Sequence, residues 1–189
     1  MRKVTYSMGV SLDGYVIGPD GEFAWTAPSE EVFRFSTEEV GGVGTHLLGR
    51  RLYESMLVWE TTEEVPGLGF STAEFAHRWR RIPKVVFSTT LTEVEGNARL
   101  LSGGLVEEVE RLRAEPGEGD IAIGGADLAA QVITAGLVDE YRIRYYPVLV
   151  GGGTPYVPQD AVRRNVELVE SRTFGSGVVF LHYRTVREG

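Results

Sequence analysis

Residues 121–153, IAIGGADLAAQVITAGLVDEYRIRYYPVLVGGG, indicate the architecture more clearly than any other part of the chain. They begin with a continuous apolar run typical of a buried strand, which stops at Gly124 and Gly125. Helical periodicity follows over 126–135, and Gly136 stands where a left-handed residue commonly ends a helix. A second strand then runs to three further glycines. Strand, helix and strand in this order predict a parallel pair with the helix as its crossover.

The same alternation extends outward through the first three quarters of the chain. Apolar runs bounded by turn residues predict strands at about 3–10, 45–49, 84–89, 98–101, 120–124, 139–150, 165–171 and 177–186. Helical periodicity predicts helices at roughly 29–40, 50–57, 71–80, 104–114 and 126–135. The last two strands leave no room for a helix, and Gly175-Ser176-Gly177 predicts a hairpin between them. We therefore expect an α/β fold whose sheet is mixed, mostly parallel, with an antiparallel C-terminal hairpin.

Length, composition and charge indicate the kind of protein and of partner. A chain of 189 residues with 42% hydrophobic residues is long enough for one core, and no linker or repeat divides it, so residues 1–189 are expected to form a single domain. The net charge of −8 and the pI near 5 oppose general attraction to nucleic acid or anionic membranes. We expect a small-molecule partner, no nucleic acid and no membrane.

Cysteine and histidine usage limits the available chemistry. The absence of cysteine excludes disulfides and thiolate catalysis and suits a reducing cytoplasm. His46, His77 and His182 lie far apart, and none has the i, i+4 partner of a helical metal site, so no metal is predicted. Polar residues interrupt the apolar part of 1–18, which argues against a signal peptide, and no run approaches about 18 apolar residues. A cytoplasmic protein is expected.

Two junctions between a strand and a helix stand out as anion sites. In LLGRRLYES a strand ends at Gly49 before Arg50 and Arg51, and in IAIGGADLAAQ a strand ends at Gly124 and Gly125. Helix N-termini offer free N–H groups and partial positive charge, and glycine lets a phosphate approach the backbone. The alternative is that these glycines only make tight turns, since neither G-x-G-x-x-G nor a P-loop is present. Two such junctions at one sheet edge favour a dinucleotide.

Side chains near these junctions refine that prediction. A guanidinium at the first turn of a phosphate-binding helix suits a further phosphate such as the 2′-phosphate of NADP, and Arg50 holds that position. Ser88, Thr89 and Thr90 at the end of VVFSTTL would add hydroxyl donors. Alternatively, they are simply small and β-branched residues that finish a strand.

Four motifs together resemble the dihydrofolate reductase fold in order and spacing. They are VIG at 16–18 followed by Trp25 and Pro28, then GRRLYES, VVFST and IGGADL. The C-terminal third, GGADLAAQVITAGLVDEYRIRYYPVLVGGGTPY, is similar to the reductase domain of the bifunctional riboflavin-biosynthesis deaminase/reductase and its stand-alone relatives. The resemblance covers the whole chain and implies a three-layer fold with helices on both faces of the sheet.

The resemblance implies NADPH as cofactor. The nicotinamide would lie beside the loop from Val10 to Gly18, the first-helix arginine would contact the 2′-phosphate, and Gly124-Gly125, often joined by a cis peptide, would lie under the pyrophosphate. The cofactor-binding residues implied in this way are Val10, Ile17, Gly18, Gly49, Arg50, Arg51, Ser88, Thr89, Thr90, Gly124, Gly125, Ala126, Asp127 and Leu128.

Two carboxylates are candidates for catalysis. The resemblance aligns Glu30 with a carboxylate that holds the substrate heterocycle and assists its protonation, which a desolvated carboxyl group with a raised pKa can do. The competing interpretation is that Ser29 caps a helix and Glu30 complements its dipole. Asp13, in Asp-Gly, is either a turn former or a group beside the nicotinamide.

Departures from the family pattern bear on the substrate. Folate-reducing relatives carry an arginine where this sequence has Ile82, which argues against dihydrofolate, and the zinc-dependent deaminase half is absent. The sequence thus predicts a stand-alone NADPH-dependent reductase acting on a nitrogen heterocycle, resembling 5-amino-6-(5-phosphoribosylamino)uracil reductase. Alternatives are a dihydrofolate or pterin reductase and a nucleotide-binding protein without turnover.

A homodimer is also expected, because riboflavin-type relatives commonly dimerise. In the strand at 139–150, Tyr141, Ile143 and Tyr145 alternate with Arg142, Arg144 and Tyr146, so neither face is cleanly polar. One of these faces could meet a partner chain. The alternative is that helices cover both of them.

Overall fold

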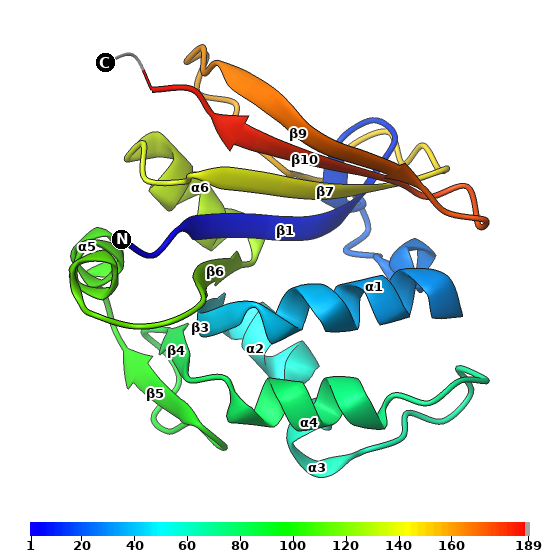
Figure 1. Ribbon diagram of the computed structural model, residues 1–189, viewed down its shortest axis with the longest axis horizontal. Coiled ribbons are helices and arrows are strands. Elements are labelled where there is room, and N and C mark those ends of the chain that lie inside the picture. The colour runs from blue at the N-terminus through cyan, green and yellow to red at the C-terminus, as the bar shows by residue number, and fades with distance from the viewer. Residues whose placement is uncertain (188–189) are drawn as a thin grey trace.

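The computed structural model describes residues 1–187, and eight strands in that range form one sheet (Figure 1). They are β1 (Val4–Ser11), β3 (Val43–Gly49), β4 (Lys84–Phe87), β5 (Ala98–Leu101), β6 (Asp120–Gly124), β7 (Glu140–Tyr146), β9 (Val166–Thr173) and β10 (Val179–Thr185). Their order is β5-β4-β3-β6-β1-β7-β10-β9. The first six in this order run parallel, whereas β10 pairs antiparallel with both β7 and β9. The predicted mixed sheet with an antiparallel C-terminal hairpin is confirmed.

Helices cover both faces of the parallel part (Figure 1). They are α1 (Glu30–Gly41), α2 (Arg50–Met56), α3 (Val58–Thr61), α4 (Ala73–Arg81), α5 (Leu105–Ala114) and α6 (Ala126–Thr134), with a 3-10 turn at Ala24–Thr26. α5 and α6 pack on one face, and α1, α2 and α4 pack on the other. Between residues 1 and 187, no helix has the length and apolar character that crossing a bilayer requires.

Adjacent residues of one strand pack into different hydrophobic clusters, one on each face of the sheet. Leu47 of β3 packs in the cluster that includes α5 and α6, whereas Leu48 packs with Phe75 and Trp79 of α4. Because successive side chains of a strand point to opposite faces, a strand covered on both sides needs apolar residues at every position. This explains the continuous apolar runs that mark the parallel strands in the sequence.

The observed bounds differ from the predicted ones where special residues intervene. The strand predicted over 139–150 ends at Tyr146, because Pro147 has no N–H to continue the ladder. A second sheet of two strands, β2 (Tyr15–Ile17) and β8 (Thr154–Pro155), was not predicted. These strands and the four-residue α3 are too short to show a period.

Both turns inferred from glycine are present. Gly136 follows the C-cap of α6 with φ of 69°, as expected for a left-handed residue. The β9–β10 hairpin closes through the Phe174 N–H bonded to the Val178 carbonyl at 2.9 Å, with Gly177 at φ of 84°. These turns fix where α6 ends and how the last strand joins the sheet.

The strand considered for dimerisation is covered on both sides. Tyr141 and Ile143 belong to the core that includes α6, while Arg144 contacts Ser7 of β1 and Glu39 of α1. The alternative interpretation, coverage by helices, is thus correct for β7. By contrast, every residue of the outer strand β9 is exposed.

Candidate active site

All six parallel strands end at the same edge of the sheet, and the predicted cofactor residues gather there. β3 leads directly into α2, and β6 leads into α6. The two junctions are adjacent, because Leu48 pairs with Gly124 and Gly49 pairs with Phe87 of β4. Ligands of open α/β sheets bind at this C-terminal edge. The fold thus brings the two glycine junctions and the end of β4 together.

Gly124 and Gly125 have different roles despite their adjacency. A Cβ on Gly124 would lie 2.7 Å from the Leu48 and Leu52 side chains, so this glycine permits α2 to pack against β6. Gly125 has φ of 97°, and no atom lies within 4 Å of its ideal Cβ position. The peptide between them is trans, which corrects the cis peptide implied by the resemblance. Only Gly125 borders open space.

The first turn of α6 presents backbone donors at this edge. Gly125 is the N-cap and has no side chain, and the Ala129 N–H donates to the Gly125 carbonyl at 3.0 Å. The N–H groups of Ala126, Asp127 and Leu128 therefore have no partner within the helix. The Asp127 carboxylate is exposed in the same turn and opposes an anion. The backbone, and not side-chain charge, makes this turn suited to phosphate.

The first turn of α2 combines backbone donors with two exposed guanidinium groups. Gly49 is its N-cap, with nothing within 4 Å of an added Cβ. Arg50 lies 4.0 Å from Glu54, and both side chains are nearly half exposed. Arg51 is also exposed. An ion pair this open contributes little, so both guanidinium groups can turn toward an anion.

The residues after β4 form a tight turn. The Ser88 hydroxyl accepts hydrogen bonds from the Thr90 and Leu91 N–H groups at 3.1 and 3.0 Å. This hydroxyl therefore closes the turn, whereas the side chains of Thr89 and Thr90 are exposed at the edge. Thr89 and Thr90 are therefore the residues of this segment whose hydroxyl groups could contact a ligand.

The loop after β1 is tied to the three glycines at 151–153. Asp13 accepts hydrogen bonds from the Val150 and Gly151 N–H groups at 3.2 and 2.7 Å. Gly153 has φ of 116°, and a Cβ there would overlap the Ile17 carbonyl oxygen. The sequence interpretation used these glycines only as a family feature. The structural role of Gly153 is to let the chain approach β2 closely.

These hydrogen bonds also determine the ionisation of Asp13. The hydrogen bond with Ser11 lowers the pKa of Asp13, and the Gly151 and Val150 N–H groups lower it further, against a smaller effect of desolvation. A carboxylate held in its charged form does not donate a proton readily. The structure thus assigns Asp13 an anchoring role, and a part in catalysis stays a prediction.

Val10, Ile17 and Gly18 lie beside this loop. The side chain of Val10 is fully buried in the core, and Ile17 packs against the same cluster. Gly18 is buried and donates its N–H to the Glu22 carbonyl at 2.8 Å. For Val10, the main chain is thus the part that a cofactor could touch.

Glu30 is the first residue of α1 and is exposed. The Ser29 hydroxyl accepts from the Val32 N–H at 3.4 Å, so the capping interpretation of this segment is correct. Glu31 instead accepts from the Gly175 N–H at 2.9 Å and ties α1 to the hairpin. Glu30 is open to solvent, and its role in the chemistry stays a prediction.

An aromatic wall next to β1 was not predicted as part of the site. A Cβ on Gly9 would lie 2.9 Å from Cε2 of Tyr146, so glycine makes room for this ring over β1. Trp25 packs edge-on against Tyr146 with ring centroids 6.2 Å apart, and its buried Nε1 has no hydrogen-bond partner among the described residues. Only the isolated tryptophan in the sequence hinted at this wall. The Tyr146 ring is buried in the cluster with Val32 and Phe180, so this wall is part of the core beside β1.

Over residues 1–187, no group of three histidine, cysteine or carboxylate side chains is arranged to hold a metal ion. The site is therefore described by its backbone donors, guanidinium groups and hydroxyls.

A sequence relative of this chain has been identified in Bacillus subtilis (strain 168). The uncharacterised protein YyaP is 31% identical over 182 residues, which cover 96% of this chain and 94% of YyaP.

Three solved structures are similar in fold. A Shewanella sp. PV-4 protein named "Putative riboflavin biosynthesis protein" has a TM-score of 0.76 at 22% identity, covering 99% of this chain and 100% of that chain. The Thermotoga maritima diaminohydroxyphosphoribosylaminopyrimidine deaminase/5-amino-6-(5-phosphoribosylamino)uracil reductase has a TM-score of 0.67 at 15% identity, covering 98% of this chain and 57% of that one. Dihydrofolate reductase from Enterococcus faecalis, complexed with NADP(H), has a TM-score of 0.63 at 17% identity, with coverage of 97% and 96%.

These structures confirm the dihydrofolate reductase-like fold that the motifs implied. The family model of the RibD C-terminal domain matches residues 2–180, which include both glycine junctions, β9 and the turn that leads into β10. This chain therefore belongs to the RibD C-terminal domain family.

Proposed function

We propose that this protein is an NADPH-dependent reductase that transfers hydride to a C=N or C=O bond of a small nitrogen heterocycle. One observation carries the proposal: in a member of the RibD C-terminal domain family, two adjacent helices begin at Gly49 and Gly125, and no atom lies within 4 Å of a Cβ added at either glycine. Two neighbouring sets of backbone donors suit a ligand with two separated phosphate groups, as NADPH has.

The residues of this edge fit the parts of NADPH. In the proposal, the N–H groups of Ala126, Asp127 and Leu128 bind the pyrophosphate, since no carbonyl group within the helix accepts from them. Arg50 and Arg51 bind the 2′-phosphate, for which a guanidinium fork is the best-matched donor.

Three further segments complete the cofactor site in this proposal. Thr89 and Thr90, positioned by the turn that Ser88 closes, line the adenosine side. The main chain at Val10, Ile17 and Gly18 borders the nicotinamide. NADPH supplies the hydride when bound, and the protein fixes the distance and orientation at which it meets the substrate.

Reduction of a C=N bond also consumes one proton at nitrogen. The hydrogen bonds to Asp13 keep it charged, so we propose that it orders the loop around the nicotinamide. Glu30 remains the candidate for accepting hydrogen bonds from the heterocycle and relaying a proton from solvent.

The proposed substrate class is a ribosylaminopyrimidine-type heterocycle, as the name of the Thermotoga maritima enzyme specifies for that protein. Ile82 is buried at the end of α4, so the position expected for a folate-binding arginine is apolar and inaccessible here. This observation weighs against dihydrofolate.

A nucleotide-binding protein without turnover is the second candidate. The exposure of Glu30 and the anchoring role of Asp13 favour it, because neither carboxylate has the environment of a proton donor.

An NADPH-oxidation screen separates the two candidates. The purified protein is mixed with NADPH and with dihydropterin, ribosylaminopyrimidine or flavin substrates, and the loss of NADPH absorbance is followed. Turnover with the ribosylaminopyrimidine is the expected result. Tight NADPH binding without turnover of any substrate would instead favour the binding protein.

We also propose that the protein is a homodimer that uses the outer strand β9. Val166, Leu168 and Val169 of β9 are 42–55% exposed, and an apolar edge strand of this kind tends to be covered by a partner. Light scattering at micromolar concentration should give twice the monomer mass, and Leu168→Lys should return it to the monomer mass. A monomeric wild-type protein would contradict this proposal.

A further inference from the structure

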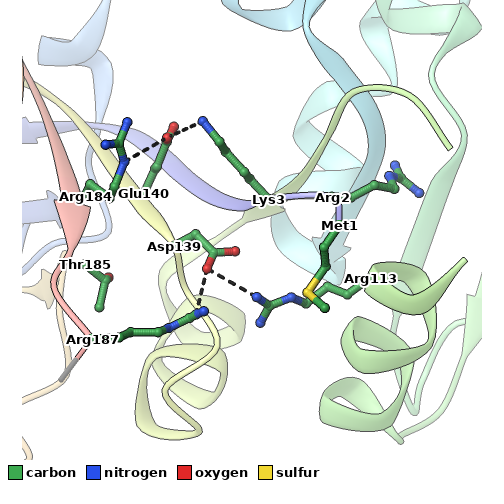
Figure 2. A pocket seen from close by; sticks show the side chains of 9 residues that line it. All are labelled: Met1, Arg2, Lys3, Arg113, Asp139, Glu140, Arg184, Thr185 and Arg187. Atoms are coloured by element: carbon green, nitrogen blue, oxygen red, sulfur yellow. Dashed lines mark hydrogen bonds and ion pairs between the residues drawn. The ribbon is translucent and has the colours of Figure 1, made fainter. Parts of the chain in front are cut away.

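A cavity of about 340 Å³ lies at the opposite edge of the sheet from the candidate active site (Figure 2). It is bounded by the start of β1, the end of β10, the start of β7 and the C-terminal end of α5. β1 has eight residues, which at about 3.3 Å each separate the two edges by roughly 25 Å. No residue proposed to bind NADPH lines this cavity.

The cavity is cationic in a chain that is acidic overall. Five Lys or Arg side chains and two carboxylates line it, whereas the whole chain has a net charge of −8. Arg2 turns away from it (Figure 2) and donates to the Gly119 carbonyl and the Thr45 hydroxyl. Lys3, Arg113, Arg184 and Arg187 supply the remaining positive charge.

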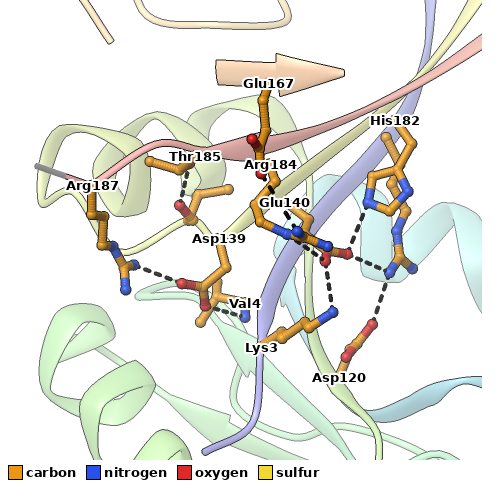
Figure 3. Close-up of polar contacts among 12 residues, drawn as sticks. Lys3, Val4, Asp120, Asp139, Glu140, Glu167, His182, Arg184, Thr185 and Arg187 are labelled. Atoms are coloured by element: carbon orange, nitrogen blue, oxygen red, sulfur yellow. Dashed lines mark hydrogen bonds and ion pairs between the residues drawn. The ribbon is translucent and has the colours of Figure 1, made fainter. Parts of the chain in front are cut away.

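Each of the two carboxylates that line the cavity already accepts several hydrogen bonds (Figure 3). Asp139 accepts from the Val4 N–H at 2.8 Å, from Arg187 at 2.6 Å and from Arg113 at 3.3 Å. A carboxylate accepts about four hydrogen bonds, so little capacity is left for the other N–H groups of these two arginines.

Glu140, the second carboxylate of the cavity, also accepts hydrogen bonds from several donors. Its side chain is 1% exposed, and it accepts from Lys3 at 2.7 Å, Arg142 at 2.8 Å and His182 at 2.9 Å. Arg184 stands 3.9 Å away, beyond hydrogen-bond distance. Arg184 instead donates one N–H to Glu167 of β9 at 3.5 Å, which leaves its other N–H groups for a ligand.

Guanidinium donors therefore remain unused at this edge. The Arg113 side chain is only 12% exposed, and its buried Nε has no hydrogen-bond partner among the described residues. A buried donor without an acceptor costs stability unless a ligand or water supplies one. Each guanidinium carries five N–H groups, and Arg113 and Arg187 each use one of them on Asp139. The site thus has donors in excess and too few acceptors.

We propose that this cavity binds the phosphate group of a small phosphorylated molecule, held by Arg113, Arg184 and Arg187. A tetrahedral phosphate offers several oxygens to a guanidinium cluster and forms bidentate pairs with it. The cavity is at the small end of ligand pockets, which span about 300–1,000 Å³, and it accommodates one sugar phosphate more readily than a polymer. The site is independent of the proposed NADPH site.

Calorimetric titration of the full chain with ribose 5-phosphate, and separately with inorganic phosphate, tests the proposal. We expect saturable binding of ribose 5-phosphate, with at least tenfold lower affinity in Arg113→Gln and in Arg187→Gln. Arg187 is about half exposed, so the second variant keeps the test valid if the buried Arg113 proves necessary for folding.

Arg34→Gln is the matched control, because it removes an exposed guanidinium of α1 that lines neither the cavity nor the proposed NADPH site, so the affinity should be unchanged. An affinity lost in Arg50→Gln, at the proposed NADPH site, but retained in both cavity variants would overturn the proposal, as would the absence of heat at millimolar concentration. Equal affinity for inorganic phosphate and the sugar phosphate would assign the cavity to the free ion and contradict a phosphorylated molecule as its ligand.

Discussion

The C-terminal and N-terminal edges of the parallel strands present positive charge in two different ways. At the C-terminal edge the donors are main-chain N–H groups at the starts of α2 and α6, next to Gly49 and Gly125. At the N-terminal edge they are guanidinium groups arranged around Asp139 and Glu140. Main-chain donors are fixed by backbone geometry, whereas side-chain donors depend on counter-charges. The first edge should therefore be sensitive to changes of shape, and the second to changes of charge.

Glu140→Gln tests the charge-dependent edge and should have the largest effect. The carboxylate is buried among Lys3, Arg142, His182 and Arg184. Removing one member of a buried ion cluster leaves its partners uncompensated, which should cost about 3 kcal/mol of unfolding free energy. Urea denaturation at pH 7 measures this difference. The exposed Glu167→Gln is the matched control, and its effect should stay below about 0.5 kcal/mol.

The pH dependence of the same variant provides a second measurement. Burial alone would raise the pKa of Glu140, but hydrogen bonds from Lys3 and Arg142 and the charge of His182 outweigh burial and hold the pKa at about 2. In the unfolded chain the pKa of the Glu140 carboxyl group is higher, at about 4.3. Its contribution to stability is therefore complete above the unfolded pKa and is lost as the pH falls toward 2. Parallel stability profiles of wild type and variant in this range would contradict the assignment.

Gly153→Ala tests the shape-dependent edge. A Cβ would overlap the Ile17 carbonyl, and φ of 116° is unfavourable for alanine, so a loss of about 2–3 kcal/mol is expected. Gly49→Ala is the comparison, because φ there is −75° and no atom lies within 4 Å of the added Cβ. It should keep the wild-type stability and weaken NADPH binding. Equal stability losses in the two variants would argue against the geometric explanation.

Asp13→Asn should have the smallest effect on stability. An amide oxygen still accepts one hydrogen bond, so the loop loses a charge-assisted contact to Val150 or Gly151 worth about 1 kcal/mol. If Asp13 anchors the loop, the variant raises the KM for NADPH and leaves the pH dependence of kcat unchanged. A shifted pH profile would instead identify Asp13 as a proton-transfer group.

The sequence was sufficient for the architecture because local signals agreed with one another. The apolar run before Gly124, the helix ended by Gly136 and the hairpin turn at Gly177 all appear as expected. The predicted strand after α6 was too long, since the alternation of side chains alone does not indicate that strand pairing stops at Pro147. β2 and β8 escaped prediction because each is set by its contact with the other, between residues 137 and 140 positions apart in the chain.

The candidate site was predicted only in part, because some roles depend on register. Gly124 and Gly125 are equivalent in sequence, and only the pairing of β6 with β3 makes the first face Leu48 and Leu52. The capping by Ser29 was foreseeable from the local pattern. The hydrogen bond from the Gly151 N–H to Asp13 could not be foreseen, since these residues are far apart in the sequence and meet only in the folded protein.

The cavity at the N-terminal edge had no signal in the sequence. Arg113, Asp139 and Arg187 come from three elements, and their neighbours along the chain do not distinguish them from surface charges. Charge balance within the folded structure, and not a motif, identifies this second site.

The central claim, that the C-terminal edge binds NADPH through the start of α2, is tested most directly by comparing thermal stabilisation by NADPH and by NADH. A ligand that binds only the native state raises the melting temperature according to its affinity. We predict a larger rise with NADPH than with NADH at equal concentration in the wild type, and equal rises in Arg50→Ala. Equal stabilisation of the wild-type protein by the two cofactors would contradict the claim.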